Sequence, residues 1–131
     1  MSTIKRLLLV DDDRDDLDLF ASTLKDIGRK IKLKTVQNWN ELQAFLARCP
    51  KNELPNLAIL DLNMPYKGGV ECLSMLKESA EYKHIPVVIF STSVKQDVKQ
   101  QCFQLGAMSC IEKPENYQTY KDVVHYMVNL V

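Results

Sequence analysis

Short apolar segments alternate along this chain with longer segments in which apolar residues recur every three or four positions. The apolar runs at 7–10 and 57–60 have no helical period and are too short to form independent helices. We therefore predict strands at 7–10, at 31–36 (an edge strand in which apolar residues alternate with lysines), at 57–61, at 87–90 and at 108–112.

The longer segments between these strands have the apolar spacing of helices. In the first, apolar residues recur from Leu17 to Ile27, and Gly28 follows as a residue that ends helices. Asp13 lies where an acidic residue can accept hydrogen bonds from the free amides of a helix N-terminus. Four further helices are predicted at about 40–48, 70–76, 94–105 and 117–131.

Strand and helix alternate five times, a pattern that predicts an α/β fold in which helices cover both faces of a parallel sheet. The right-handed connections of such sheets leave few topologies open. A chain of 131 residues is long enough for one domain with a full core. Since no repeat or linker is present, we expect residues 1–131 to form a single domain without a separate output domain.

Composition excludes several classes of partner. The chain carries 17 basic and 17 acidic residues, so its net charge does not favour nucleic acid or an anionic membrane. The four cysteines form no Cys-x-x-Cys pair, which indicates free thiols in a reducing compartment. No apolar run approaches the length of a membrane span. We expect a cytoplasmic protein that binds neither nucleic acid nor membrane.

Charged and hydroxyl side chains follow four of the predicted strands. Asp11 and Asp12 follow the first strand, Asp61 ends the third, Ser91 follows the fourth, and Lys113 follows the fifth. Because the carboxyl ends of parallel strands meet at one edge of a sheet, we expect these groups to converge there.

Such a group of residues has a defined chemistry. Three neighbouring carboxylates repel one another by several kcal/mol unless protons or a cation are present. An all-oxygen site suits Mg²⁺. With this metal and Lys113, the site has the charge to hold a phosphoryl group, and the Ser91 hydroxyl can donate a hydrogen bond to it. Asp61 is then the best-placed carboxylate to act as a nucleophile toward phosphorus.

Together and in this order, these segments resemble the receiver domain of two-component response regulators over essentially the whole chain. The resemblance is carried by LLLVDDD at 7–13, LDLNMP at 60–65 with Gly69, VVIFS at 87–91, Gly106-Ala107 and Lys113-Pro114. It implies a flavodoxin-like, doubly wound fold of five parallel strands in the order 2-1-3-4-5 with five helices.

The resemblance also implies a ligand set and a phosphoryl acceptor. Asp61 would receive the phosphoryl group from a sensor histidine kinase or a phosphotransfer protein. Asp12 and Asp61 would bind Mg²⁺ directly, the main-chain carbonyl of Asn63 would add a ligand, and Asp11 would act through a bound water. The protein would be a signalling switch that acts on a downstream protein target. Beyond its own phosphorylation and slow dephosphorylation, it would not be an enzyme.

Switching roles follow from the same resemblance. Ser91 would move toward the phosphoryl group, and Lys113 would pair with the phosphoryl group. A cis bond between Lys113 and Pro114 would direct the lysine inward. Asn63 and Ser93 would tune the access of hydrolytic water, and Ser93 is also a candidate cap of the fourth helix. The fourth helix, the fifth strand and the fifth helix would form the face through which the protein docks or forms a homodimer.

One residue of this chain departs from the receiver pattern, and one turn is similar to a subgroup of receivers. Many receivers have Tyr or Phe three residues before the lysine, where this chain has Cys110, so the aromatic half of the usual switch is missing. Thr92-Ser93 after the fourth strand is similar to the turn of stand-alone receivers that partner phytochrome-like sensor kinases.

Other interpretations of the same residues stay open. A receiver fold without switching would be a phosphorylation-independent docking module, which Cys110 motivates but which the presence of every group needed for phosphorylation disfavours. A haloacid-dehalogenase-type phosphatase would need a second aspartate where this chain has Asn63. A flavodoxin would need a glycine- and hydroxyl-rich loop after the first strand, where aspartates would repel a flavin phosphate. The acidic residues Asp15, Asp16 and Asp18 are interpreted as a solvated helix start.

Overall fold

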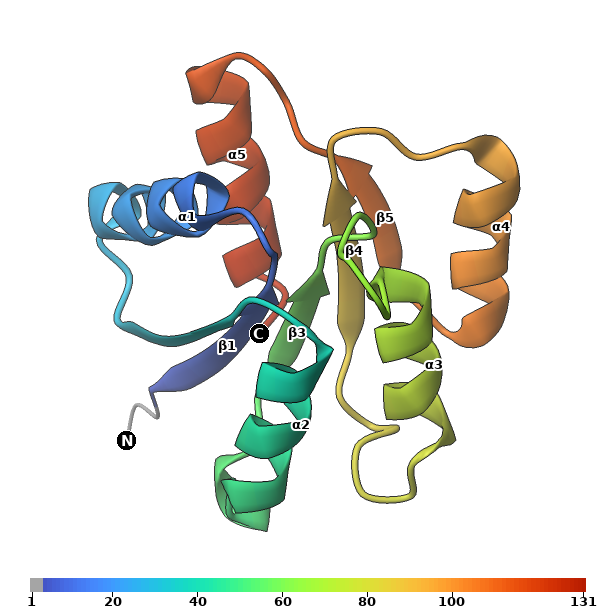
Figure 1. Cartoon of the computed structure of the whole chain (residues 1–131). Helices are drawn as coiled ribbons and strands as arrows, with labels where there is room; N and C mark the ends of the chain where they lie inside the picture. The colour runs from blue at the N-terminus through green and yellow to red at the C-terminus, as the bar shows by residue number, and fades with distance from the viewer. Residues whose placement is uncertain (1–3) are drawn as a thin grey trace.

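The computed structural model describes residues 4–131 and contains a single parallel sheet with the strand order β2-β1-β3-β4-β5 (Figure 1). The strands are β1 (Lys5–Val10), β2 (Ile31–Val36), β3 (Leu57–Leu60), β4 (Val87–Ser91) and β5 (Ser109–Glu112). The predicted flavodoxin-like order is confirmed. Residues 1–3 of the predicted domain lie outside the described residues.

Five helices cover the two faces of the sheet (Figure 1). They are α1 (Arg14–Ile27), α2 (Trp39–Arg48), α3 (Gly69–Glu78), α4 (Gln96–Leu105) and α5 (Tyr117–Val128), and a short 3-10 turn spans Lys51–Glu53. One core lies between the sheet and α2, α3 and α4, and the other between the sheet and α1 and α5. Within residues 4–131, none of these helices has the length and apolar character needed to cross a bilayer.

Burial explains why the strands form where the apolar runs predict them. All residues of β3 and β4 are buried, as expected for central strands that are covered on both faces. β2 lies at the edge of the sheet, and its side chains alternate between half-buried and exposed up to the buried Val36. The prediction of an edge strand at 31–36 is therefore confirmed.

The register of the strands brings their carboxyl ends to one level. Val10 of β1 pairs with Leu60 of β3, so Asp11 and Asp61 follow at equivalent positions. The Asp61 amide donates to the Val10 carbonyl at 2.9 Å. At the other side of the sheet, the Lys113 amide donates to the Ser91 carbonyl at 2.8 Å. This edge of the sheet therefore carries all the strand-end groups that the sequence singles out.

The first helix begins and ends as predicted. The Asp13 side chain accepts hydrogen bonds from the amides of Asp15 and Asp16, and Gly28 ends the helix in a left-handed conformation with φ of 77°. The placement of acidic residues in this first turn also agrees with the helix dipole.

Several element boundaries differ from the prediction. Helix α4 begins at Gln96 with Lys95 as its cap, so Ser93 does not cap it. The Val94 amide instead donates to the Glu112 carboxylate at 3.3 Å, which keeps this residue in the loop before the helix. Helix α5 ends at Val128, and the Asn129 side chain accepts a hydrogen bond from Arg29 at 2.6 Å. Strand β1 begins two residues early, at Lys5.

The start of α3 packs tightly against the end of β3. A Cβ atom on Gly69 would lie 2.4 Å from the carbonyl oxygen of Asp61 and 2.9 Å from the Cα atom of Leu62. Both neighbours are backbone atoms, which cannot move away as a flexible side chain does. Glycine at this position therefore allows the helix to approach the strand end that carries Asp61.

We expect the Gly69→Ala variant to lose about 1–3 kcal/mol of unfolding free energy, because a methyl group must displace the backbone after β3. Urea unfolding measures this loss. Gln100→Ala, on the exposed side of α4, is the control and should stay within about 0.5 kcal/mol of the parent protein. Equal stabilities of the two variants would contradict the close contact at Gly69.

Candidate functional site

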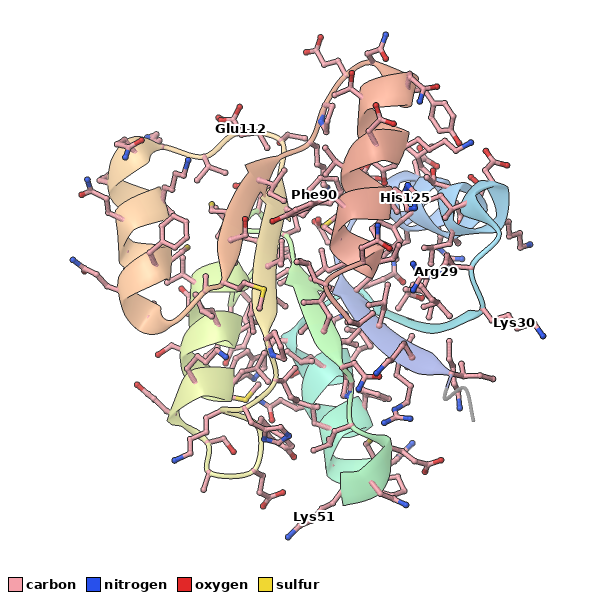
Figure 2. The ribbon with its side chains drawn as sticks, turned by 180° about the vertical axis from the view of Figure 1, so that it is seen from behind. Arg29, Lys30, Lys51, Phe90, Glu112 and His125 are labelled. Carbon is pink, nitrogen blue, oxygen red and sulfur yellow. The ribbon has the colours of Figure 1, made fainter. Side chains whose placement is uncertain are left out.

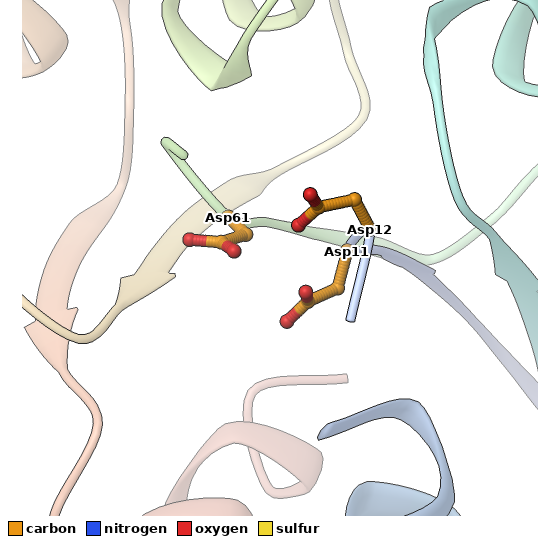
Figure 3. A group of neighbouring side chains, drawn as sticks. All are labelled: Asp11, Asp12 and Asp61. Atoms are coloured by element: carbon orange, nitrogen blue, oxygen red, sulfur yellow. The ribbon is translucent and has the colours of Figure 1, made fainter. Parts of the chain in front are cut away.

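Three carboxylates meet at the carboxyl end of the sheet. Asp11 and Asp12 follow β1, and Asp61 faces them from the end of β3 (Figure 3). One oxygen from each lies within 4.8 Å of the others. Asp11 and Asp61 are 2% and 6% exposed, whereas Asp12 is open to solvent. The predicted convergence of these residues is confirmed.

The two oxygens of the Asp61 carboxylate have different surroundings. Oδ1 accepts a hydrogen bond from the buried Ser91 hydroxyl at 2.6 Å and one from the Asn63 amide at 3.3 Å. The Asn63 side-chain amide donates in turn to the Ser91 oxygen at 3.2 Å. Within residues 4–131, Oδ2 has only an ion-pair contact, with the Lys113 Nζ atom at 3.8 Å. The network therefore fixes one oxygen and leaves the other available.

Lys113 lies among the carboxylates as predicted, but it reaches them by a different route. Its Nζ atom lies 2.6 Å from Asp11 Oδ2 and 2.9 Å from Asp16 Oδ2, and its side chain is 9% exposed. The expected cis bond to Pro114 is wrong, since residues 4–131 contain no cis peptide bond. The hydrogen bonds to Asp11 and Asp16 direct the lysine inward with a trans bond.

Asp16 is a residue of this site that the sequence interpretation missed. The interpretation of Asp15, Asp16 and Asp18 as a solvated helix start fails for Asp16, whose carboxylate forms an ion pair with Lys113. The available signal was its place in the first helical turn, five residues after Asp11. That spacing does not specify which way the side chain points, so it could not separate Asp16 from its acidic neighbours.

Burial and charge shift the proton affinities of the paired groups. Burial raises the pKa of Asp11 to about 6, although the hydrogen bonds from Lys113 and from the Asp13 amide act to lower it. Burial alone would lower the pKa of Lys113, but its hydrogen bonds to Asp11 and Asp16 raise that pKa above its ordinary value. The lysine is therefore fully charged at neutral pH, and it offsets part of the negative charge.

An aromatic cluster supports the floor of the site. Phe90 extends from β4 toward α5 (Figure 2), and its ring centroid lies 6.5 Å from that of Phe20 and 5.7 Å from that of Tyr120. The Lys113 Nζ atom lies 5.9 Å from the centre of the Phe90 ring. This distance allows a cation–π contribution to the position of the lysine, whose side chain is 9% exposed.

The donor set suits a hard divalent cation. Carboxylate oxygens are the ligands that Mg²⁺ and Mn²⁺ prefer, and an exposed Asp12 leaves room for water ligands. One lysine does not balance the carboxylates of Asp11, Asp12 and Asp61, so this corner has an excess of negative charge. The residues present therefore fit a metal site with protein ligands and water.

The cysteines do not extend this site. All four are free, and burial raises the pKa of each thiol, to about 11 in Cys72. Such thiols are protonated at neutral pH and are weak nucleophiles. Cys110 is half-buried and packs against the core under α2, α3 and α4. The position three residues before Lys113 therefore holds a small apolar side chain.

Comparison with known proteins supports the resemblance seen in the sequence. The family model described as the response regulator receiver domain matches residues 7–125. The response regulator Rcp1 of Synechocystis sp. is 33% identical over 115 residues, which are 86% of this chain and 78% of that protein.

Solved structures of two similar proteins share the fold. The phosphorylated cyanobacterial phytochrome response regulator RcpA has a TM-score of 0.85 and 30% identity, with coverage of 95% of this chain and 91% of that chain. The Mn²⁺-bound form of Rcp1 has a TM-score of 0.82 and 31% identity, with coverage of 94% and 91%.

We expect Lys113→Met to lower the unfolding free energy of the metal-free protein by about 3 kcal/mol at pH 7.5, because it leaves buried carboxylates without their cation. The loss should be smaller at pH 5, since Asp11, whose pKa burial raises to about 6, is then protonated. Urea unfolding with a chelator present measures both values. Lys83→Met, at an exposed position, is the control. A loss that is the same at both pH values would argue against charge compensation by Lys113.

Proposed function

Because the chain belongs to the response regulator receiver domain family, we propose that it is a phosphorylation switch whose acceptor is Asp61. The observation that carries this proposal is the position of Asp61 between the acidic residues after β1 and the pair formed by Ser91 and Lys113. The first group supplies a cation site, and the second supplies donors for a phosphoryl group. Phosphoryl transfer needs both types of group around its nucleophile.

In the proposed reaction, Asp61 Oδ2 attacks the phosphorus of a phosphohistidine. An O–P bond forms, the P–N bond breaks, and its electron pair returns to the imidazole. Oδ1 stays oriented by its hydrogen bonds from Ser91 and Asn63, so the carboxylate keeps a fixed direction. The resulting acyl phosphate is an anion, which favours contact with the Lys113 ammonium and the Ser91 hydroxyl.

We propose that Mg²⁺ is the resident cation of this site. Its ligands would be Asp12, Asp61 and the main-chain carbonyl of Asn63, with Asp11 acting through a water. When bound, it would offset the negative charge of the phosphoryl oxygens. The carboxylate cluster supports this proposal, as does the existence of an Mn²⁺-bound structure of Rcp1.

The proposed donor is a sensor histidine kinase or a phosphotransfer protein, and the output is a change in binding to a downstream protein. RcpA is named as a cyanobacterial phytochrome response regulator, which favours a phytochrome-like kinase among the candidate donors. We propose that the protein works in the cytoplasm as a stand-alone receiver. In this proposal it binds neither nucleic acid nor membrane, and it has no enzymatic role beyond its own phosphorylation and dephosphorylation.

We expect acetyl phosphate with Mg²⁺ to add one phosphoryl group to the protein, and Asp61→Asn to abolish the addition because it removes the nucleophile. Intact mass spectrometry measures the adduct. A parallel reaction with a chelator in place of Mg²⁺ should give no adduct.

Asp18→Asn, at an exposed position of α1, is the matched control and should be modified like the parent protein. A folded protein that forms no adduct under any of these conditions would overturn the switch. That result would favour the alternative, a phosphorylation-independent docking module.

The face formed by α4, β5 and α5 is the proposed site of homodimerisation. Phe103 of α4 and Met108 before β5 are 46% and 50% exposed, so this face offers large apolar side chains for a contact. We expect a phosphoryl mimic to raise the mass measured by light scattering from monomer to dimer, and Phe103→Ser to prevent the change. A monomer with and without the mimic would contradict this proposal.

A further inference from the structure

Lys113 contacts three carboxylates at unequal distances. Its Nζ atom lies at hydrogen-bond distance from Asp11 and Asp16, at 2.6 Å and 2.9 Å, but 3.8 Å from Asp61. An ammonium has three N–H donors, and a separation of 3.8 Å is too long for one of them to form a hydrogen bond. The lysine is therefore held by the β1 and α1 carboxylates rather than by the candidate acceptor.

The position of Asp16 explains this preference. It lies in the first turn of α1, where Asp13 caps the helix and accepts the amides of Asp15 and Asp16. The cap fixes the backbone of this turn, so the Asp16 carboxylate reaches Lys113 from a rigid helix end. Asp16 is half-buried, with 33% of its side chain exposed, whereas Asp15 is exposed. The contact is thus specific to one residue of the acidic turn.

We propose that Asp16 is a positioning residue that holds the Lys113 ammonium on the α1 side of the site, out of hydrogen-bond distance from Asp61, until an anion binds there. The proposal rests on the proposed function, because that anion is the phosphoryl group. Two consequences follow. Asp61 Oδ2 stays free of a hydrogen bond that would weaken it as a nucleophile. A phosphoryl group on Asp61 must also draw the same ammonium away from Asp16, so Asp16 opposes the phosphorylated state.

The test uses beryllofluoride, a mimic of the phosphoryl group, titrated in the presence of Mg²⁺ and followed by amide NMR. We expect Asp16→Asn to bind beryllofluoride about tenfold more tightly than the parent protein, because the neutral side chain competes less for Lys113. Asp16→Glu keeps a charged acceptor in the same place and should restore an affinity within about twofold of the parent.

Asp15→Asn is the matched control for charge. It removes one negative charge from the same helical turn, but within residues 4–131 Asp15 forms no ion pair or hydrogen bond with Lys113. We expect the affinity of Asp15→Asn for beryllofluoride to change by less than about twofold, since solvent and salt screen an exposed charge. Equal gains for Asp15→Asn and Asp16→Asn would mean that net charge alone is responsible, and this result would overturn the proposal.

A crystal structure of metal-free Asp16→Asn provides a readout that does not depend on phosphorylation. We expect Lys113 Nζ to approach Asp61 Oδ2 to about 3 Å, a hydrogen-bond distance. A lysine that remains 3.8 Å away, as in the parent protein, would overturn the positioning role. If the parent protein bound no beryllofluoride, the proposed function would fail, while this structure would still test Asp16.

Discussion

One ammonium group offsets part of the negative charge that this fold concentrates at the end of its sheet. Asp11 and Asp61 are almost fully buried, and Asp16 lies beside them, so their mutual repulsion occurs in an environment that screens charge poorly. Lys113 offsets this repulsion from the centre of the cluster. The compensation is incomplete, because one lysine faces the three carboxylates of Asp11, Asp16 and Asp61. A site with residual negative charge has an intrinsic affinity for cations, and the same imbalance makes a fixed lysine important for the stability of the fold.

The elements around this cluster were largely predictable because hydrophobic burial decides them. The strands β3 and β4 are buried along their whole length, so their apolar runs were clear in the sequence. Where hydrogen bonding rather than burial sets a boundary, the prediction failed. Strand β1 begins at Lys5 because its backbone pairs with Ile31 of β2, and a backbone pairing leaves no mark on the apolar pattern. The edge position of β2, in contrast, was evident from its alternating lysines.

The site was predictable to the extent that strand ends define it. Asp11, Asp61 and Ser91 directly follow or end strands, and the parallel arrangement alone brings them together. Asp16 reaches the site from a helix, and its direction depends on how α1 packs against the sheet, which the sequence pattern does not encode. The predicted cis bond between Lys113 and Pro114 was wrong for a related reason. A trans bond to Pro114 suffices because two carboxylates direct the side chain from outside its own strand.

The contact between Lys113 and Asp11 joins residues that are 102 positions apart in the chain. During synthesis, β1 and β3 leave the ribosome long before β5 does, and their carboxylates then have no nearby ammonium. An emerging chain can pair these strands, but it cannot neutralise their ends until the last strand has arrived. The acidic corner therefore gains its internal cation only when the last strand of the domain has formed. Nascent chains that stop short of Lys113 should therefore have a less stable folded state in the absence of a metal ion.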